Sequence, residues 1–239
     1  FHGPWSGDGD PGTNFNSPLF ATDADTSPEP YATNFNLAAS VQNYIVRGVP
    51  REKLNAGLAF YGRAYGNVEN TNNGLYADYD GVADDGTWED GFYDYWDLSE
   101  NYIDMVGYDR FWQDEAKVPW LYNTSPQIMI SYDDKASIQA KAEYIISENL
   151  GGGMFWEFSG DKDSHLLNVI NEVFNNYTEN DCTPGDINGD SILNVLDVVI
   201  LVNSILSEAI DDCGDLNGDE SLDVLDIVLL VNIIITTEI

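Results

Sequence analysis

Acidic and amide side chains recur at one spacing in two segments near the C-terminus of the 239-residue chain. The first segment reads GDINGDSILNVLD and the second GDLNGDESLDVLD, beginning at Gly185 and Gly214. Counted from the first Asp of each, side-chain oxygens stand at positions 1, 3, 5, 9 and 12. Oxygen donors at these steps, with a backbone carbonyl at position 7, suit Ca²⁺. The chemistry that this spacing indicates is therefore the binding of a hard cation.

Two matching copies favour two calcium sites over the alternative of an acidic, solvated turn. The expected ligands are Asp186, Asn188, Asp190, Ile192, Asn194 and Asp197 in the first loop, and Asp215, Asn217, Asp219, Ser221, Asp223 and Asp226 in the second. Position 12 is Asp rather than the longer Glu, and position 6 is Ser191 or Glu220 where a sharp turn favours Gly. Both loops are therefore expected to bind calcium somewhat weakly.

Each loop leads into an almost wholly apolar segment, residues 195–206 and residues 224–235. A helix that is apolar on nearly every side must be buried on nearly every side. Two short helices cannot bury that much surface against each other, so part of it is expected to bind a partner. The Val and Ile content also allows a buried strand, but a loop of this geometry leads into a helix.

The tandem pattern D-x-N-x-D followed by [ND]-V-L-D resembles a type I dockerin, a module that attaches exported enzymes to a scaffold by binding cohesin domains. The resemblance implies a small all-α domain over residues 182–239, with two EF-hand-like loops that bind two Ca²⁺ ions. It also implies a cohesin-type partner that contacts positions 10 and 11 of each loop, and the repeated pair implies binding in either of two orientations. These positions are Val195, Leu196, Val224 and Leu225.

The formal net charge of −33 argues against a nucleic-acid or anionic-membrane partner. Thirteen of the 42 Asp and Glu residues follow Asn180, whereas none of the nine Lys and Arg residues does. This shift predicts a domain boundary, with residues 176–181 as a polar linker. No apolar run is long enough to span a membrane.

The only cysteines, Cys182 and Cys213, each precede one acidic loop. A disulfide between them would indicate an exported, extracellular protein. Two free buried thiols are the alternative.

Residues before the linker alternate between helical and strand-like patterns. An amphipathic helix is expected over 39–50, an apolar strand within 52–66, helix, glycine turn and strand over 135–161, and a final helix over 164–177. This order indicates an α/β fold with a parallel sheet. The stretch over about 66–131 is rich in Tyr, Trp, Gly and Asp and is too long for a loop, so it is expected to form an inserted subdomain.

Several motifs in this region, in order along the chain, resemble the C-terminal part of a family 18 glycoside hydrolase, the chitinase family. FHGPW resembles the end of the sixth strand of its (β/α)8 TIM barrel, LAFYGR the seventh strand and GGGMFWEFSGD the eighth. GFYDYWDL, VPWLYN and ISYDD resemble its insertion domain. The resemblance implies that residues 1–175 are the C-terminal portion of such a barrel, with an α+β insertion subdomain over about 66–131.

The resemblance also implies an activity: hydrolysis of β-1,4-linked N-acetylglucosamine polymers, assisted by the substrate's own N-acetyl group and needing no cofactor. Trp156 would form the floor of the subsite where the chain is cut, although a Trp at a strand tip can also belong to the core. Tyr61 and Arg63 would donate hydrogen bonds to neighbouring sugars of chitin or a chitooligosaccharide, and Trp5 would line the leaving-group side.

The family's proton-donor motif, D-x-x-D-x-D-x-E, does not occur in this sequence. No catalytic residue is therefore assigned, and the chain alone is expected to be inactive while its parent is an enzyme. One alternative is a chitin-binding or scaffold-anchoring protein without catalysis. Another is a glycosidase that uses Glu157 with an acid such as Asp161. Strand alternation argues against it, because it places Glu157 on the face of the strand opposite to that of Trp156.

Overall fold

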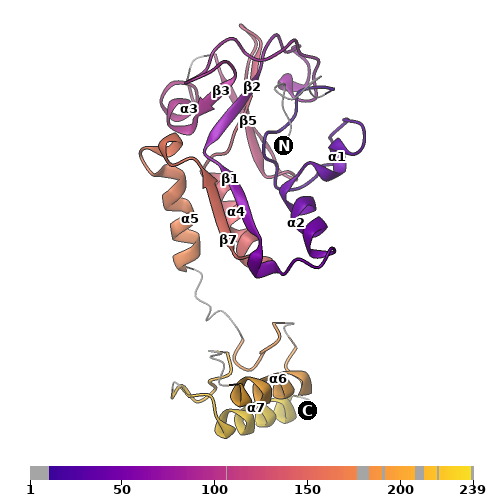
Figure 1. Ribbon diagram of the computed structural model, residues 1–239, viewed down its shortest axis with the longest axis vertical. Coiled ribbons are helices and arrows are strands. Elements are labelled where there is room, and N and C mark those ends of the chain that lie inside the picture. The colour runs from indigo at the N-terminus through magenta and orange to yellow at the C-terminus, as the bar shows by residue number, and fades with distance from the viewer. Residues whose placement is uncertain are drawn as a thin grey trace. The chain divides into compact units, whose positions relative to one another are not determined.

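The computed structural model describes residues 11–105, 107–176, 183–189, 192–207, 213–219 and 221–237. The chain divides into two compact units, Phe1–Phe174 and Asn175–Ile239 (Figure 1). The α-helices are α1 (Tyr31–Asn34), α2 (Leu37–Ile45), α3 (Tyr95–Asn101), α4 (Lys135–Ser147), α5 (His165–Asn176), α6 (Val195–Leu206) and α7 (Val224–Thr237). The strands are β1 (Asn55–Ala59), β2 (Tyr61–Tyr65), β3 (Phe92–Asp94), β4 (Asp109–Gln113), β5 (Val118–Asn123), β6 (Ile128–Ser131) and β7 (Gly152–Trp156). Short 3₁₀ helices are η1 (Arg51–Lys53), η2 (Asn72–Gly74) and η3 (Phe158–Asp161).

Strands β1 and β7 form a parallel pair in which Asn55 lies opposite Gly152 and Ala59 opposite Trp156. Helix α4 packs against both strands (Figure 1). Because side chains alternate along a strand, Leu58 and Phe155 join the core beneath the helices. The parallel α/β arrangement predicted for these two segments is confirmed.

A five-stranded antiparallel sheet in the order β3-β2-β6-β5-β4 occupies the chain between β1 and α4. The single strand predicted within 52–66 is wrong, because the chain changes sheets at Phe60. The Phe60 amide donates to Trp156 O at 2.8 Å, and Phe60 O accepts from the Tyr95 amide at 3.0 Å. One residue therefore joins the two sheets, and the inserted sheet begins at Tyr61 rather than at about residue 66.

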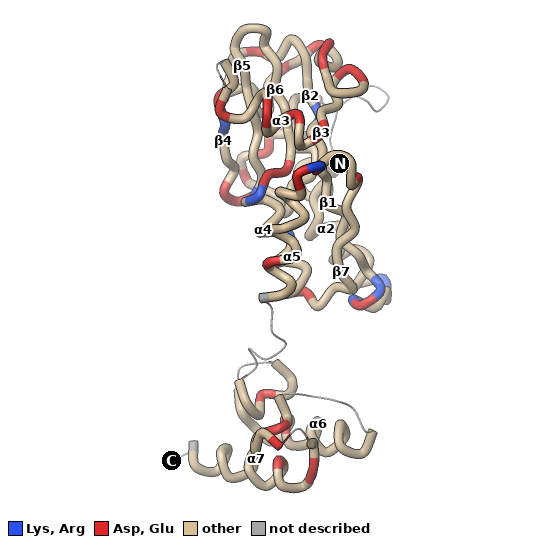
Figure 2. The backbone as a smooth tube through the Cα atoms, turned by 90° about the vertical axis from the view of Figure 1, so that its left-hand side faces the viewer, with Lys and Arg blue, Asp and Glu red and all other residues tan. Residues whose placement is uncertain are grey.

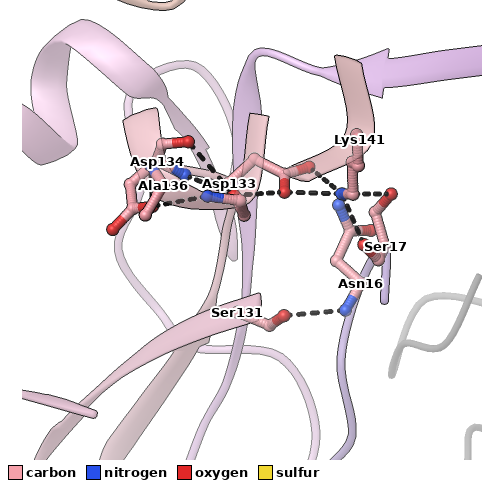
Figure 3. A network of polar contacts seen from close by, with 8 residues as sticks. Asn16, Ser17, Ser131, Asp133, Asp134, Ala136 and Lys141 are labelled. Atoms are coloured by element: carbon pink, nitrogen blue, oxygen red, sulfur yellow. Dashed lines mark hydrogen bonds and ion pairs between the residues drawn. The ribbon is translucent and has the colours of Figure 1, made fainter. Parts of the chain in front are cut away.

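A buried ion pair connects α4 to the segment that precedes α1 (Figure 3). Lys141 and Asp133 have fully buried side chains, and Lys141 Nζ lies 2.5 Å from Asp133 Oδ1. The same ammonium donates to Ser17 O at 2.6 Å and to Ser17 Oγ at 3.1 Å. Asp133 Oδ1 also accepts from Ser137 Oγ at 2.7 Å. Every strong donor and acceptor of the pair is thus engaged, which buried charges require.

The C-terminal unit consists of α6 and α7, which pack together, and the loop that precedes each helix. Both segments predicted as helices are helical, and the buried-strand alternative is wrong. Cys213 is disulfide-bonded; Cys182, the only other cysteine of the chain, lies outside the described residues. Gly185 N donates to Cys213 O at 3.0 Å, so the start of one loop is fixed to the start of the other.

Figure 2 shows that Lys and Arg occur only in the first unit, so acidic side chains of the second have no basic neighbour within it. Among the described residues, no helix combines the length and apolar character needed to cross a bilayer.

Candidate functional site

Trp156 lies at the C-terminal end of β7 and is 61% exposed. Met154, on the same face of the strand, is 53% exposed. The backbone beneath the indole is fixed, because Trp156 O accepts the hydrogen bond from Phe60 N. The peptide bond between Trp156 and Glu157 is cis. Within the described residues, Trp156 is thus a surface side chain rather than a core one, as a sugar-stacking role requires.

Tyr61 and Arg63, the two predicted hydrogen-bond donors, lie on one face of β2. The ring of Tyr61 stacks on that of Phe92, with centroids 5.0 Å apart. Arg63 Cζ lies 4.8 Å from the centroid of Phe92, and Arg63 Nη1 is 3.3 Å from Glu89 Oε1. Phe92 therefore positions both side chains. Their contact with sugar stays a prediction, and Trp5 lies outside the described residues.

Glu157 and Asp161 do not form the acid pair of the alternative two-carboxylate hypothesis. Glu157 is exposed and directly precedes η3. Asp161 is 3% exposed, and its oxygens accept backbone hydrogen bonds from the first turn of α5, each at 2.9 Å. The donors are the amides of His165, Leu166 and Leu167. Asp161 is therefore the cap of α5, and its burial keeps it from facing a substrate.

Replacing Asp161 with Ala is expected to lower the free energy of unfolding by about 1–2 kcal/mol, because three helical amides lose their acceptor. Asp161→Asn keeps one oxygen and should lose less. Urea unfolding measures the change, and Asp163→Ala, at an exposed acid two residues away, is the matched control. Equal stability of the Asp161→Ala and Asp163→Ala variants would contradict the capping role.

The first acidic loop wraps its backbone around Asp197, which is fully buried. Asp197 Oδ1 accepts from Ile187 N at 3.0 Å and from Asn188 N at 3.3 Å, and Oδ2 accepts from Asn194 N at 2.9 Å. Asn194 caps α6 by accepting from Leu196 N at 2.8 Å. Asp186 is 6% exposed. The predicted ligand Asp190 lies outside the described residues.

The second loop repeats this arrangement around Asp226, which is also fully buried. Asp226 accepts from Leu216 N at 3.0 Å and from Asp223 N at 2.9 Å. Asp215 Oδ1 accepts from Gly218 N at 2.8 Å, and Asn217 Nδ2 donates to Asp219 Oδ2 at 2.9 Å.

The side chains around both loops offer only oxygen donors, which is the chemistry that Ca²⁺ takes. Burial of the last Asp of each loop holds backbone amides of that loop around its carboxylate. Among the described residues, no three acidic, His or Cys side chains converge closely enough to form a metal cluster. Calcium binding therefore stays a prediction.

The four predicted partner-binding residues are exposed at the first turn of each helix. Val195 and Leu196 are 67% and 57% exposed, and Val224 and Leu225 are 66% and 58% exposed. One turn further along, Val199 and Val228 are each about half exposed. The two helices thus present matching apolar faces that the unit itself does not cover.

Two features of the first unit were not expected from the sequence. Lys141 falls among Ile138, Ala142 and Ile145, the buried side of α4, and that spacing could have marked it as buried. Trp88 is 72% exposed, and its indole N–H donates to the buried Asp94. The pairing of Trp88 with Asp94 depends on a turn that the sequence pattern did not specify.

Residues 1–161 match the family model described as Glycosyl hydrolases family 18. Chitinase A1 of Niallia circulans is 46% identical over 156 residues, which are 65% of this chain and 22% of that protein. Chitinase B of Serratia marcescens is 32% identical over 168 residues, 62% of this chain and 33% of that protein. The chain therefore spans between a fifth and a third of the length of these curated relatives.

Solved structures of chitinases share the fold of the first unit. Chitinase ChiA74 from Bacillus thuringiensis aligns with a TM-score of 0.65 and 35% identity, over 73% of this chain and 30% of that one. The group IV chitinase of Ostrinia furnacalis, solved in complex with allosamidin, aligns with a TM-score of 0.65 and 28% identity, over 73% of this chain and 48% of that one. From the motifs, the parallel strand pair with its inserted sheet, and these matches, the chain belongs to glycosyl hydrolase family 18.

Proposed function

We propose that this chain supplies the C-terminal part of a chitinase, which hydrolyses β-1,4-linked N-acetylglucosamine polymers by the substrate-assisted, retaining mechanism. The observation that carries the proposal is the exposed indole of Trp156 at the C-terminal end of a parallel strand, where barrel enzymes place their sites. A flat indole suits the apolar face of a pyranose ring. Tyr61 and Arg63, which are positioned by Phe92, provide polar groups on β2, the strand that begins directly after Phe60.

In this mechanism the N-acetyl oxygen of the substrate attacks the anomeric carbon while an acid protonates the glycosidic oxygen. Trp156 would hold the reacting sugar so that its N-acetyl group reaches that carbon, which lowers the entropic part of the barrier. The acid would come from a D-x-x-D-x-D-x-E segment of the complete gene product. Without that segment, binding without hydrolysis is the competing function, and the complete sequence distinguishes the two.

Trp156→Ala in the complete gene product is expected to lower kcat/KM for chitooligosaccharides about a hundredfold, because the stacking surface at the reacting sugar is lost. Trp156→Phe keeps a flat ring and should recover part of the rate. Hydrolysis rates and thermal unfolding are measured for each variant. An unchanged rate in a normally folded Trp156→Ala protein would contradict the proposal and make Trp156 a packing residue.

For the C-terminal unit, we propose a type I dockerin that binds two Ca²⁺ ions and docks onto a cohesin-type module outside the cell. Bound calcium would neutralise the carboxylates of each loop and fix the start of each helix. Val195, Leu196, Val224 and Leu225 would then form the apolar contact, and their exposure supports this role. The disulfide at Cys213 supports an exported protein.

The cohesin contact is tested by replacing the two exposed apolar residues at the start of one helix while those of the other helix stay unchanged. Val195→Ser with Leu196→Ser should leave cohesin binding largely intact, because Val224 and Leu225 provide the same contact in the other orientation. Only the fourfold variant should lose binding in calorimetric titrations.

A further inference from the structure

The second acidic loop contains an Asn-Gly pair, Asn217–Gly218, and both of its residues are exposed. In such a pair the glycine nitrogen can attack the side-chain carbonyl carbon of the asparagine, because the attack closes a five-membered ring within one chain and glycine has no Cβ to crowd it. A Cβ added at Gly218 would meet no other atom within 4 Å, so the surroundings leave the ring room to form. Solvent also reaches the pair, as hydrolysis of that ring requires.

The attacking nitrogen already donates its hydrogen bond to a carboxylate. Gly218 N donates to Asp215 Oδ1 at 2.8 Å. A general base must lie within hydrogen-bond reach of the proton that it removes, and this distance meets that condition. A carboxylate can hold a cation through one oxygen and an N–H group through the other. The contact is therefore compatible with the calcium ion proposed for this loop.

The carbonyl group under attack is polarised by a second backbone amide. Asn217 Oδ1 accepts from Asp219 N at 2.8 Å. An N–H group aimed at this oxygen stabilises the negative charge that the oxygen gains as nitrogen adds to the carbon. The leaving nitrogen, Asn217 Nδ2, donates to Asp219 Oδ2 at 2.9 Å. Both ends of the carboxamide are thus held in one orientation.

The Asn-Gly pair of the first unit, Asn73–Gly74, lacks these features. Gly74 N donates at 2.8 Å to Thr71 O, a carbonyl oxygen that cannot take up the proton. Gly74 is buried, and a Cβ added there would collide with the ring of Tyr122. Asn73 O accepts from Trp120 Nε1 at 3.0 Å. The same dipeptide is therefore present in one protein with a base and without one.

We propose that Asn217 is a site of self-catalysed deamidation and that Asp215 is its base. Asp215 takes the proton from Gly218 N as that nitrogen bonds to Asn217 Cγ. The bond between Cγ and Nδ2 then breaks, and Nδ2 leaves as ammonia with the proton that Asp215 held. Water opens the resulting succinimide at either carbonyl group, which leaves an aspartate or an isoaspartate at position 217.

The isoaspartate product would change the loop, because it adds one methylene to the backbone. Residues on both sides of position 217 are held by one buried carboxylate, since Asp226 accepts from Leu216 N and from Asp223 N. A longer backbone between them is incompatible with both contacts at once. The reaction would therefore limit the lifetime of the folded C-terminal unit, a property that goes beyond the proposed function and does not rest on it.

Ageing of the complete chain in calcium buffer, with and without urea, tests whether the folded loop promotes the reaction. Peptide mass spectrometry follows the uptake of oxygen from isotope-labelled water at each asparagine. In the folded protein, Asn217 should react at least about tenfold faster than Asn73. Urea should slow the reaction at Asn217 and speed it at Asn73, because unfolding separates one from its base and releases the other from its packing. A reaction at Asn217 that is as fast in urea as in buffer would overturn the proposal.

Asp215→Asn tests the base, because it keeps an oxygen that accepts from Gly218 N but cannot take the proton. The rate at Asn217 should fall at least about tenfold. Asp223→Asn is the matched control: it removes a carboxylate from the same loop, but one that accepts from Leu225 N at 2.7 Å, and it should keep most of the rate.

Circular dichroism shows whether each variant is folded. A folded Asp215→Asn protein that deamidates at the original rate would exclude Asp215 as the base, and so would equal losses in the Asp215→Asn and Asp223→Asn variants. If Asp215→Asn does not fold, the comparison of buffer with urea in the unmodified chain still decides whether the loop promotes the reaction.

Discussion

Removal of calcium is expected to unfold the C-terminal unit of this protein while the first unit keeps its structure. Each loop gathers several carboxylates, and no Lys or Arg lies in the segment after residue 180 to offset their repulsion. Bound calcium reverses the sign of that interaction, so the free energy of binding becomes free energy of folding. At a calcium concentration about a thousandfold above Kd, each site would add about 4 kcal/mol.

Far-UV circular dichroism of the complete chain measures this effect, since α6 and α7 should lose their helicity in chelator and regain it in calcium. Calorimetry should count about two ions per chain. Asp186→Asn with Asp215→Asn removes one charge from each loop while keeping an oxygen that can accept the amides, such as Gly218 N, that Asp215 holds. Loss of the calcium response in this variant is expected. Equal helicity in chelator and in calcium would refute the metal sites.

Replacing Lys141 with Met is expected to lower the free energy of unfolding of the first unit by about 3–5 kcal/mol, because it leaves the charge of Asp133 buried without a counter-ion. The loss includes the hydrogen bonds to Ser17 that hold the segment before α1. Urea denaturation followed by tryptophan fluorescence measures it. Lys117→Met is the matched control: Lys117 pairs with Asp114 at 2.9 Å, but on the surface, where such a pair contributes less than about 1 kcal/mol.

The pH dependence of the Lys141→Met variant separates lost charge from lost packing. Burial raises the pKa of Asp133, and without the lysine the pKa should rise further. A carboxyl whose pKa is higher in the folded than in the unfolded state takes up a proton on folding. The destabilisation should therefore be largest above the folded-state pKa and should shrink as the pH falls towards the unfolded value. The same loss at every pH would indicate a packing defect.

The local sequence pattern predicted the helices of this protein better than it predicted where the chain passes from one sheet to the other. The apolar segments after each acidic loop became α6 and α7, with α6 over the expected residues 195–206, because one local rule, loop into helix, fixes both. The break at Phe60 had no such signal. Residues 55–65 read as one continuous strand, and only the hydrogen bonds of Phe60 to Trp156 and Tyr95, distant in sequence, divide it.

The same contrast between local features and contacts of distant residues applies to the candidate site. The place of Trp156 at the end of a strand could be predicted from its motif, because a short strand that follows glycines is a local feature. The stacking of Tyr61 on Phe92 and the hold of Asp94 on Trp88 join residues of different strands and turns, so they depend on register that a sequence pattern leaves open.

The inserted sheet leaves and rejoins the α/β scaffold at adjacent points. Strand β2 leads out from Phe60, and β6 returns beside it, with Arg63 opposite Ser131. A segment whose two ends lie side by side can be exchanged without separating the strands on which it is mounted, since insertions with close ends are tolerated. The part of the surface that carries Tyr61, Arg63 and Trp88 is therefore free to diverge in size and composition during evolution, or to be grafted between enzymes, while β1, β7 and Trp156 stay constant.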